Sequence, residues 1–152
     1  MRVEDLRAFV MEKGIDAKFI EHPGADGLTS EGAASATDMQ LSQILKVLCF
    51  VDKTANKCFV IIQGSKKVDI RKIPNLKKAR IATAQELKEW FNLEPGCVPP
   101  IGLPEEIQKY VDVGVKDLPF AVGSAGSRFV GITIKPDYII NQKNTGLVEL
   151  SL

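Results

Sequence analysis

Apolar and polar residues alternate along this chain in short blocks that predict both helices and strands. Near the start, Leu6, Phe9 and Val10 recur at helical spacing, so residues 3–13 are expected to form a helix that ends at Gly14. Further helical segments are expected to begin at Thr29–Glu31, to span Thr83–Phe91 and to begin as a turn at Pro136–Asp137.

The strand signals are short apolar runs bounded by turn residues. The clearest are ILKVLCFV at residues 44–51 and CFVIIQ at residues 58–63, joined by a polar turn as an antiparallel pair. Shorter strands are expected at residues 17–21, 110–115, 120–122, 129–134 and 147–150. Because strands dominate and do not alternate regularly with helices, we predict an α+β fold with a mixed, mainly antiparallel sheet and packed helices.

Length and composition narrow the class of protein. The chain has 152 residues, which favours one domain over residues 1–152, and 45% of the residues are hydrophobic, which argues against disorder. The 20 basic and 19 acidic residues give a net charge of +1, so only a local basic patch is expected. The densest one comprises Lys66, Lys67, Arg71, Lys72, Lys77, Lys78 and Arg80. This basic cluster is equally compatible with binding RNA phosphates and with being an ordinary solvent-exposed face.

Cysteine usage and the lack of apolar segments predict a compartment. Cys49, Cys58 and Cys97 cannot all pair, and with the single His22 they form no zinc pattern. No signal peptide and no run of about 20 apolar residues is visible. We therefore expect a cytoplasmic protein without a membrane partner.

The first candidate for chemistry is Lys46, the one charge in the strand run at residues 44–51. An ammonium among apolar neighbours is costly unless it meets a partner or a ligand. Lys46 is therefore a candidate to bind a phosphate or a carbonyl oxygen, and the alternative is that it reaches water from the strand end.

A second candidate is the stiff loop GCVPPIG at residues 96–102. Pro99 and Pro100 fix its backbone and have no N–H, so the amides of Cys97 and Val98 are expected to be available to a carbonyl or an oxyanion. The alternative is a rigid connector. Cys97 is also a candidate redox thiol, although no sequence feature lowers its pKa.

A third candidate is the small-residue stretch at residues 122–127, which contains Ser124 and Gly126. It is typical of a close backbone approach to a ligand and also of a plain hairpin turn. His22 precedes Pro23 and has no Ser or Cys nearby in the sequence, so a catalytic triad is not supported.

In their order along the chain, these features resemble the YbaK/ProX family of aminoacyl-tRNA deacylases, related to the editing domain of bacterial prolyl-tRNA synthetase. The resemblance runs from about Glu21 to Asp137. Its matching positions are His22-Pro23, Thr29 before a helix with the small residues Ala33 and Ala34, Lys46 in an apolar strand, the GxxxP loop from Gly96 to Pro100, the loop from Ser124 to Gly126, and the acidic Asp137. Some relatives have Gly in place of Cys97 and aromatic residues near Ile20 and Leu28.

The resemblance implies a barrel-like mixed sheet with surrounding helices, and hydrolysis of the ester between an amino acid and the 3′ adenosine of tRNA. Cys or Ala on proline tRNA are the implied substrates, with no cofactor or metal. Lys46 would position the terminal nucleotide, and the amides of Gly96, Cys97 and Val98 would hold the carbonyl. The implied substrate contacts are His22, Leu28, Thr29, Pro100, Ser124, Gly126 and Asp137.

In this interpretation water or a substrate group attacks, the partner is aminoacyl-tRNA, and prolyl-tRNA synthetase is a candidate second partner. The alternative function is a binding module that holds aminoacyl-tRNA or an aminoacyl-adenosine without hydrolysis, since no general base is obvious. The hydrolase interpretation requires Lys46 and the Gly96–Pro100 loop to face one hollow.

Overall fold

The computed structural model describes residues 2–22, 32–34 and 39–152. Its elements are α1 (Val3–Lys13), β1 (Ala17–Glu21), η1 (Leu41–Gln43), β2 (Leu45–Val51), β3 (Lys57–Gln63), η2 (Ile70–Lys72), β4 (Arg80–Ile81), α3 (Ala84–Phe91), β5 (Gln108–Asp112), η3 (Val113–Val115), β6 (Ala121–Ser127), β7 (Val130–Ile134), α4 (Pro136–Ile140) and β8 (Thr145–Val148). Residues 32–34 are helical, whereas residues 29–31, where that helix was expected to begin, lie outside the described residues.

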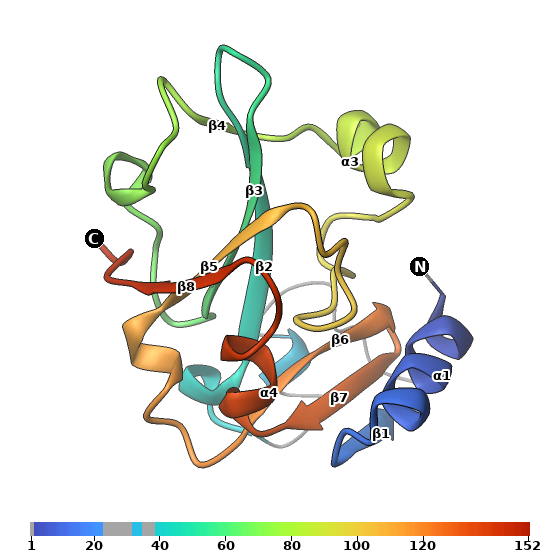
Figure 1. Cartoon of the computed structure of the whole chain (residues 1–152). Helices are drawn as coiled ribbons and strands as arrows, with labels where there is room; N and C mark the ends of the chain where they lie inside the picture. Colours follow the sequence, from blue (N-terminus) through green and yellow to red (C-terminus); the bar gives the residue numbers. More distant parts are fainter. Residues whose placement is uncertain (1, 23–31, 35–38) are drawn as a thin grey trace.

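The strands form two sheets, seen together in Figure 1. One has the order β1-β7-β6 and is antiparallel. The other has the order β4-β2-β3-β5-β8, in which β3, β5 and β8 run parallel and the remaining pairs run antiparallel. The predicted α+β class with mixed, mainly antiparallel strands is therefore confirmed. In the described part of the chain the strands form two open sheets rather than a closed barrel.

Several strand boundaries differ from the sequence prediction: β5 begins at Gln108, β8 covers Thr145–Val148 and not 147–150, and the short strand β4 was not predicted. The strand expected at residues 110–115 ends at Asp112, because the Asp112 carboxylate caps a short 3-10 turn by accepting the Gly114 N–H. The stretch at residues 122–127, for which a hairpin turn was one interpretation, belongs to strand β6. The chain reverses after Ser127 instead, before β7 begins at Val130.

The main core lies between the two sheets and under α1 and α3. Leu45, Val47 and Cys49 on alternate positions of β2 pack there with Phe59 and Ile132, which are fully buried. A smaller core covers the opposite face of the five-stranded sheet, around Phe50, Val60, Ile62, Tyr110 and Leu150. The β2–β3 pair is therefore covered by apolar residues on both faces, which explains its nearly continuous apolar sequence.

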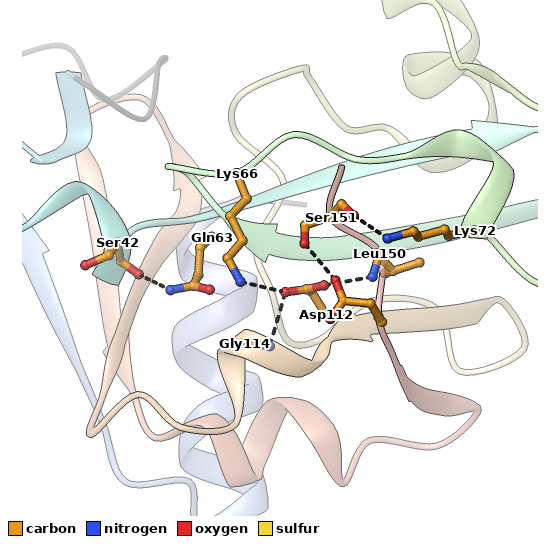
Figure 2. A network of polar contacts seen from close by, with 9 residues as sticks. Ser42, Gln63, Lys66, Lys72, Asp112, Gly114, Leu150 and Ser151 are labelled. Carbon is orange, nitrogen blue, oxygen red and sulfur yellow. Dashed lines mark hydrogen bonds and ion pairs between the residues drawn. The ribbon is translucent and has the colours of Figure 1, made fainter.

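A buried carboxylate fixes the C-terminal segment to the five-stranded sheet. Asp112 at the end of β5 has a fully buried side chain (Figure 2). It accepts hydrogen bonds from Lys66 Nζ at 3.4 Å, the Gly114 N–H at 3.1 Å and the Leu150 N–H at 2.9 Å. Two of these donors are backbone amides, so the carboxylate satisfies groups that folding removes from water.

Replacing Asp112 with Ala is expected to lower the free energy of unfolding by about 3 kcal/mol. Each buried amide left without an acceptor costs about 1–3 kcal/mol. Urea denaturation measures the change. The matched control is Lys66→Met, which removes the more exposed partner of the same pair and is expected to cost less than about 1 kcal/mol. Equal losses for the two variants would show that the ion pair, not the amides, carries the stabilisation.

Candidate functional site

Strand β6 brings several of the sequence-predicted site residues together. Ile44, just before β2, forms a parallel bridge with Val122 of β6. Lys46 and Ser124 each follow this bridge by two residues. Because side chains alternate along a strand, both leave the backbone on the same face. Lys46 is half-buried and its cross-strand partner on β3 is Ile62. It therefore points away from Leu45 and Val47, which pack in the main core.

His22 lies on the same face of the three-stranded sheet. Its N–H donates to the Phe129 carbonyl at 2.8 Å, which extends the pairing of β1 with β7 by one residue. Its Nε2 lies 3.9 Å from the position that a Cβ would take at Gly131, and Gly131 pairs with Ser124. His22 and Ser124 thus lie on one face of the three-stranded sheet. Lys46, on β2 of the five-stranded sheet, leaves its backbone on the same side through the bridge between Ile44 and Val122.

The Gly96–Pro100 loop packs against the opposite face of β6. A Cβ added at Gly123 would lie 2.7 Å from Pro100 Cδ and 2.8 Å from Pro100 Cγ, closer than real Cβ contacts come. Gln142, just after α4, donates from Nε2 to the Pro100 carbonyl at 2.8 Å. Figure 1 shows this loop between α3 and β6. Its position is therefore set by a glycine on one side and a side-chain amide on the other.

The loop's amides are not all available, which corrects one expectation. The Cys97 N–H donates to the Glu94 carbonyl at 3.0 Å within a turn, so it is not free to hold a substrate. Val98 is 5% exposed, and its N–H has no acceptor among the residues that the structure describes. The N–H of Gly96, an exposed residue with φ +79°, also has no acceptor among these residues. Buried amides are rarely left unpaired, so the Val98 N–H is the strongest candidate in this loop to donate a hydrogen bond to a bound substrate.

Cys97 and Gly126 line one cleft of about 420 Å³, bounded by the start of α1 and the end of α3. Its described lining comprises Arg2, Val3, Glu4, Lys88, Asn92, Leu93, Glu94, Cys97 and Gly126. Gly126 reaches it through an irregularity in β6, where Ser124 Oγ accepts the Gly126 N–H at 3.1 Å. Lys46 is not among these lining residues, and the alternation along β6 places Lys46 and the loop on opposite faces of that strand. The described residues therefore do not show the one hollow expected to contain both.

The remaining predicted substrate contacts are placed as follows. Asp137 lies in the first turn of α4 and is exposed; its backbone carbonyl accepts the Asn141 N–H at 3.0 Å. Leu28 and Thr29 lie outside the described residues. Cys97, expected in an exposed loop, is 5% exposed.

Sequence reasoning missed three residues that shape this region. Gly123 and Gln142 position Pro100, as described above. Lys109 on β5 is 1% exposed, and its Nζ donates to the carbonyls of Pro104, Ile107 and Lys143 at 2.8, 2.9 and 3.1 Å. Burial lowers the pKa of Lys109. The sequence carries no comparable signal for Lys109, which follows the polar Gln108 and precedes the strand predicted at residues 110–115.

A metal cluster, a reactive thiol and a membrane-spanning helix each place their own requirements on the described residues. They contain no group of three or more His, Cys, Asp or Glu side chains that could hold a metal ion. Burial raises the pKa of the Cys49 thiol to about 11 and that of Cys58 to about 12, so both stay protonated near neutral pH. No helix in the described part of the chain has the length and apolar character needed to span a membrane.

Solved structures define the fold class. One, described as a candidate trans-editing enzyme for prolyl tRNA synthetase, superposes with a TM-score of 0.86 at 22% identity, covering 99% of this chain and 96% of that one. The hypothetical protein APE2540 superposes with a TM-score of 0.82 at 23% identity, covering 94% and 97%. At these identities the likeness shows a shared fold.

The sequence comparisons define the family. Residues 24–141 match the model of the aminoacyl-tRNA editing domain, so this chain belongs to that family. Bacillus subtilis YwhH is 31% identical over 110 residues, covering 71% of this chain and 70% of YwhH. Enterococcus faecalis EbsC, named as a candidate Cys-tRNA(Pro)/Cys-tRNA(Cys) deacylase, is 22% identical over 129 residues, covering 83% and 79%. The proline–tRNA ligase of Limosilactobacillus reuteri is 25% identical over 130 residues, and the match spans 79% of this chain but 22% of the ligase.

Proposed function

We propose that this protein is a trans-editing hydrolase that deacylates mischarged aminoacyl-tRNA at the ester to the 3′ adenosine. The observation that carries the proposal is the buried Val98 amide, which has no acceptor in the described part of the chain. It lies in a loop held by Gly123 and Gln142. A preorganised amide in a region shielded from water is suited to an oxyanion that forms during ester hydrolysis.

In the proposed reaction, water adds to the aminoacyl carbonyl and the carbonyl oxygen becomes an oxyanion. The amides of Gly96 and Val98 donate to that oxygen. The bond from the carbonyl carbon to the ribose oxygen then breaks, and the proton from water ends on the ribose hydroxyl. In this proposal Lys46, on the face of β6 opposite the loop, binds the terminal nucleotide as a point charge, so the 3′ end of the substrate must contact both faces of that strand. The protein supplies neither a nucleophile nor a metal in this mechanism.

Cys-tRNA(Pro) and Ala-tRNA(Pro) are the proposed substrates, and prolyl-tRNA synthetase is the proposed second partner. The activity for which EbsC is named supports the first substrate. The similarity of this chain to a segment of proline–tRNA ligase supports the partner and the tRNA. Both substrates carry an amino acid smaller than proline, so a pocket that excludes the larger residue suffices to spare Pro-tRNA(Pro).

The test is a panel of proline tRNA charged with Cys, Ala, Ser or Pro. We expect Cys- or Ala-tRNA(Pro) to be hydrolysed roughly tenfold or more faster than Pro-tRNA(Pro), as steric selection in a small pocket allows. Addition of a chelator is expected to leave the rate unchanged. If the protein binds the charged tRNAs, releases them slowly and protects the ester of all four from hydrolysis, it is instead a binding module. Hydrolysis of none of the four, without protection, would contradict both functions.

A further inference from the structure

Two neighbouring loops at the far end of the β2–β3 pair concentrate positive charge. Residues 53–57 and residues 74–80 contain five basic residues and no acidic residue. These are Lys53, Lys57, Lys77, Lys78 and Arg80. We call this surface the basic tip. Since the whole chain has a net charge of only +1, such local enrichment makes the charge distribution asymmetric.

A buried carboxylate holds the two loops together. Asp52 is 7% exposed and accepts hydrogen bonds from the Thr54 N–H at 2.9 Å, Thr54 Oγ1 at 2.8 Å and the Asn56 N–H at 3.0 Å. It reaches the other loop through the Lys77 N–H at 3.0 Å, and the Lys53 N–H donates to the Lys77 carbonyl at 3.2 Å. These donors hold the pKa of Asp52 well below its usual range. The buried Asp52 carboxylate therefore fixes both loops, and N–H groups of the two loops stabilise its negative charge.

Three of the five cations remain available to a ligand. Arg80 is neutralised by a bidentate pair with Glu86, at 2.7 and 2.9 Å. Lys57 lies over the Trp90 ring, with Nζ 4.5 Å from its centroid. The side chains of Lys53, Lys77 and Lys78 are exposed, and none contacts a carboxylate in the residues that the structure describes. An array of exposed ammonium groups on a preformed loop pair is suited to phosphates.

The basic tip is too far from Lys46 to serve the same part of a substrate. Lys53 follows Lys46 by seven residues of nearly extended chain, which at about 3.4 Å per residue separates their backbones by roughly 24 Å. A ligand that contacts both ends must be an extended polyanion. We propose that the basic tip binds the phosphate backbone of tRNA at a distance from its aminoacylated end. This inference rests on the proposed function, because it concerns the same substrate.

The experiment compares two triple variants with the same change of charge. The test variant is Lys53→Gln/Lys77→Gln/Lys78→Gln. The control variant, Lys13→Gln/Lys116→Gln/Lys143→Gln, replaces exposed lysines on other elements. Binding of uncharged tRNA is measured by fluorescence anisotropy over a range of salt concentrations, and thermal melting verifies that both variants fold. We expect the test variant to raise Kd on the order of tenfold and to reduce the salt slope by about one for each phosphate that is no longer neutralised.

Kinetics provide a second readout. With charged tRNA, the test variant is expected to raise KM while kcat stays the same, and it is expected to hydrolyse an aminoacyl-adenosine ester as fast as the wild type. Unchanged tRNA affinity and salt slope, or an equal loss in the control variant, would overturn the inference. Unchanged tRNA affinity with lost binding to prolyl-tRNA synthetase would assign the surface to a protein partner and overturn it too. Absence of hydrolysis by the wild type would refute the proposed function alone, because uncharged tRNA binding is measured separately.

Discussion

Replacing Lys46 with Met is expected to lower kcat/KM for hydrolysis of mischarged tRNA by roughly 30-fold or more while leaving the protein folded. Removing a charge that holds an anionic ligand typically costs about 2 kcal/mol or more, and each 1.4 kcal/mol is a factor of ten. Lys46 lies on an otherwise apolar strand opposite Ile62, so Met fills the same space without the ammonium. The measurement is single-turnover hydrolysis at several tRNA concentrations, with thermal melting as the test of folding.

Two further variants separate charge from packing at this position. Lys46→Arg is expected to recover part of the activity because it keeps the positive charge. The recovery is expected to be incomplete because the planar guanidinium cannot reproduce the compact ammonium. Lys116→Met removes an exposed lysine from another region and is expected to leave hydrolysis unchanged. Activity of Lys46→Met within threefold of the wild type would remove Lys46 from the proposed mechanism.

The sequence pattern predicted the local elements well because their signals are local. The apolar run at residues 44–51 and its partner run indicated β2 and β3, which cores on both faces explain. The helix expected from Thr83 forms with Thr83 as its cap: Thr83 Oγ1 accepts the Glu86 N–H at 3.1 Å, and the Glu86 side chain accepts the Thr83 N–H at 2.9 Å.

What the sequence pattern could not predict depends on contacts between distant segments. Nothing in the sequence near Gly123 indicates that Pro100 will lie against it. The small residues around Gly123 are therefore equally compatible with a strand and with a turn. Gln142 follows Pro100 by 42 residues, and its bond to that carbonyl exists only once α4 is docked. Lys109 looks like an ordinary polar strand position until three carbonyls from two separate segments surround its Nζ.

The candidate site follows the same division. Lys46 and the Gly96–Pro100 loop could be named as candidates because a charge in an apolar run and two adjacent prolines are visible in the sequence itself. Which amide of the loop is available was not identifiable. The turn that occupies the Cys97 N–H depends on the carbonyl of Glu94, and the burial of Val98 depends on the main core. Contacts in the folded chain thus occupy the Cys97 amide and leave those of Gly96 and Val98 as the candidate donors.

Replacing Gly123 with Ala is expected to lower kcat for hydrolysis on the order of 100-fold. The new Cβ would lie 2.7 Å from Pro100 Cδ, so the ring and the amides before it must move. A displacement of about 1 Å in a catalytic group is enough for a loss of about 100-fold. KM is expected to change little, because Lys46 and the basic tip do not touch this contact. Single-turnover rates at saturating enzyme measure the effect.

Gly146→Ala is the matched control, because it makes the same substitution in another strand of the sheet region. Its Cβ would meet Tyr110 Cδ1 at 3.7 Å, an ordinary van der Waals contact, so kcat is expected to match the wild type. Urea denaturation of both variants shows whether either has lost the fold. If Gly123→Ala stays folded and hydrolyses mischarged tRNA at the wild-type rate, the position of the Val98 amide has no role in catalysis, and the oxyanion must be held by another group.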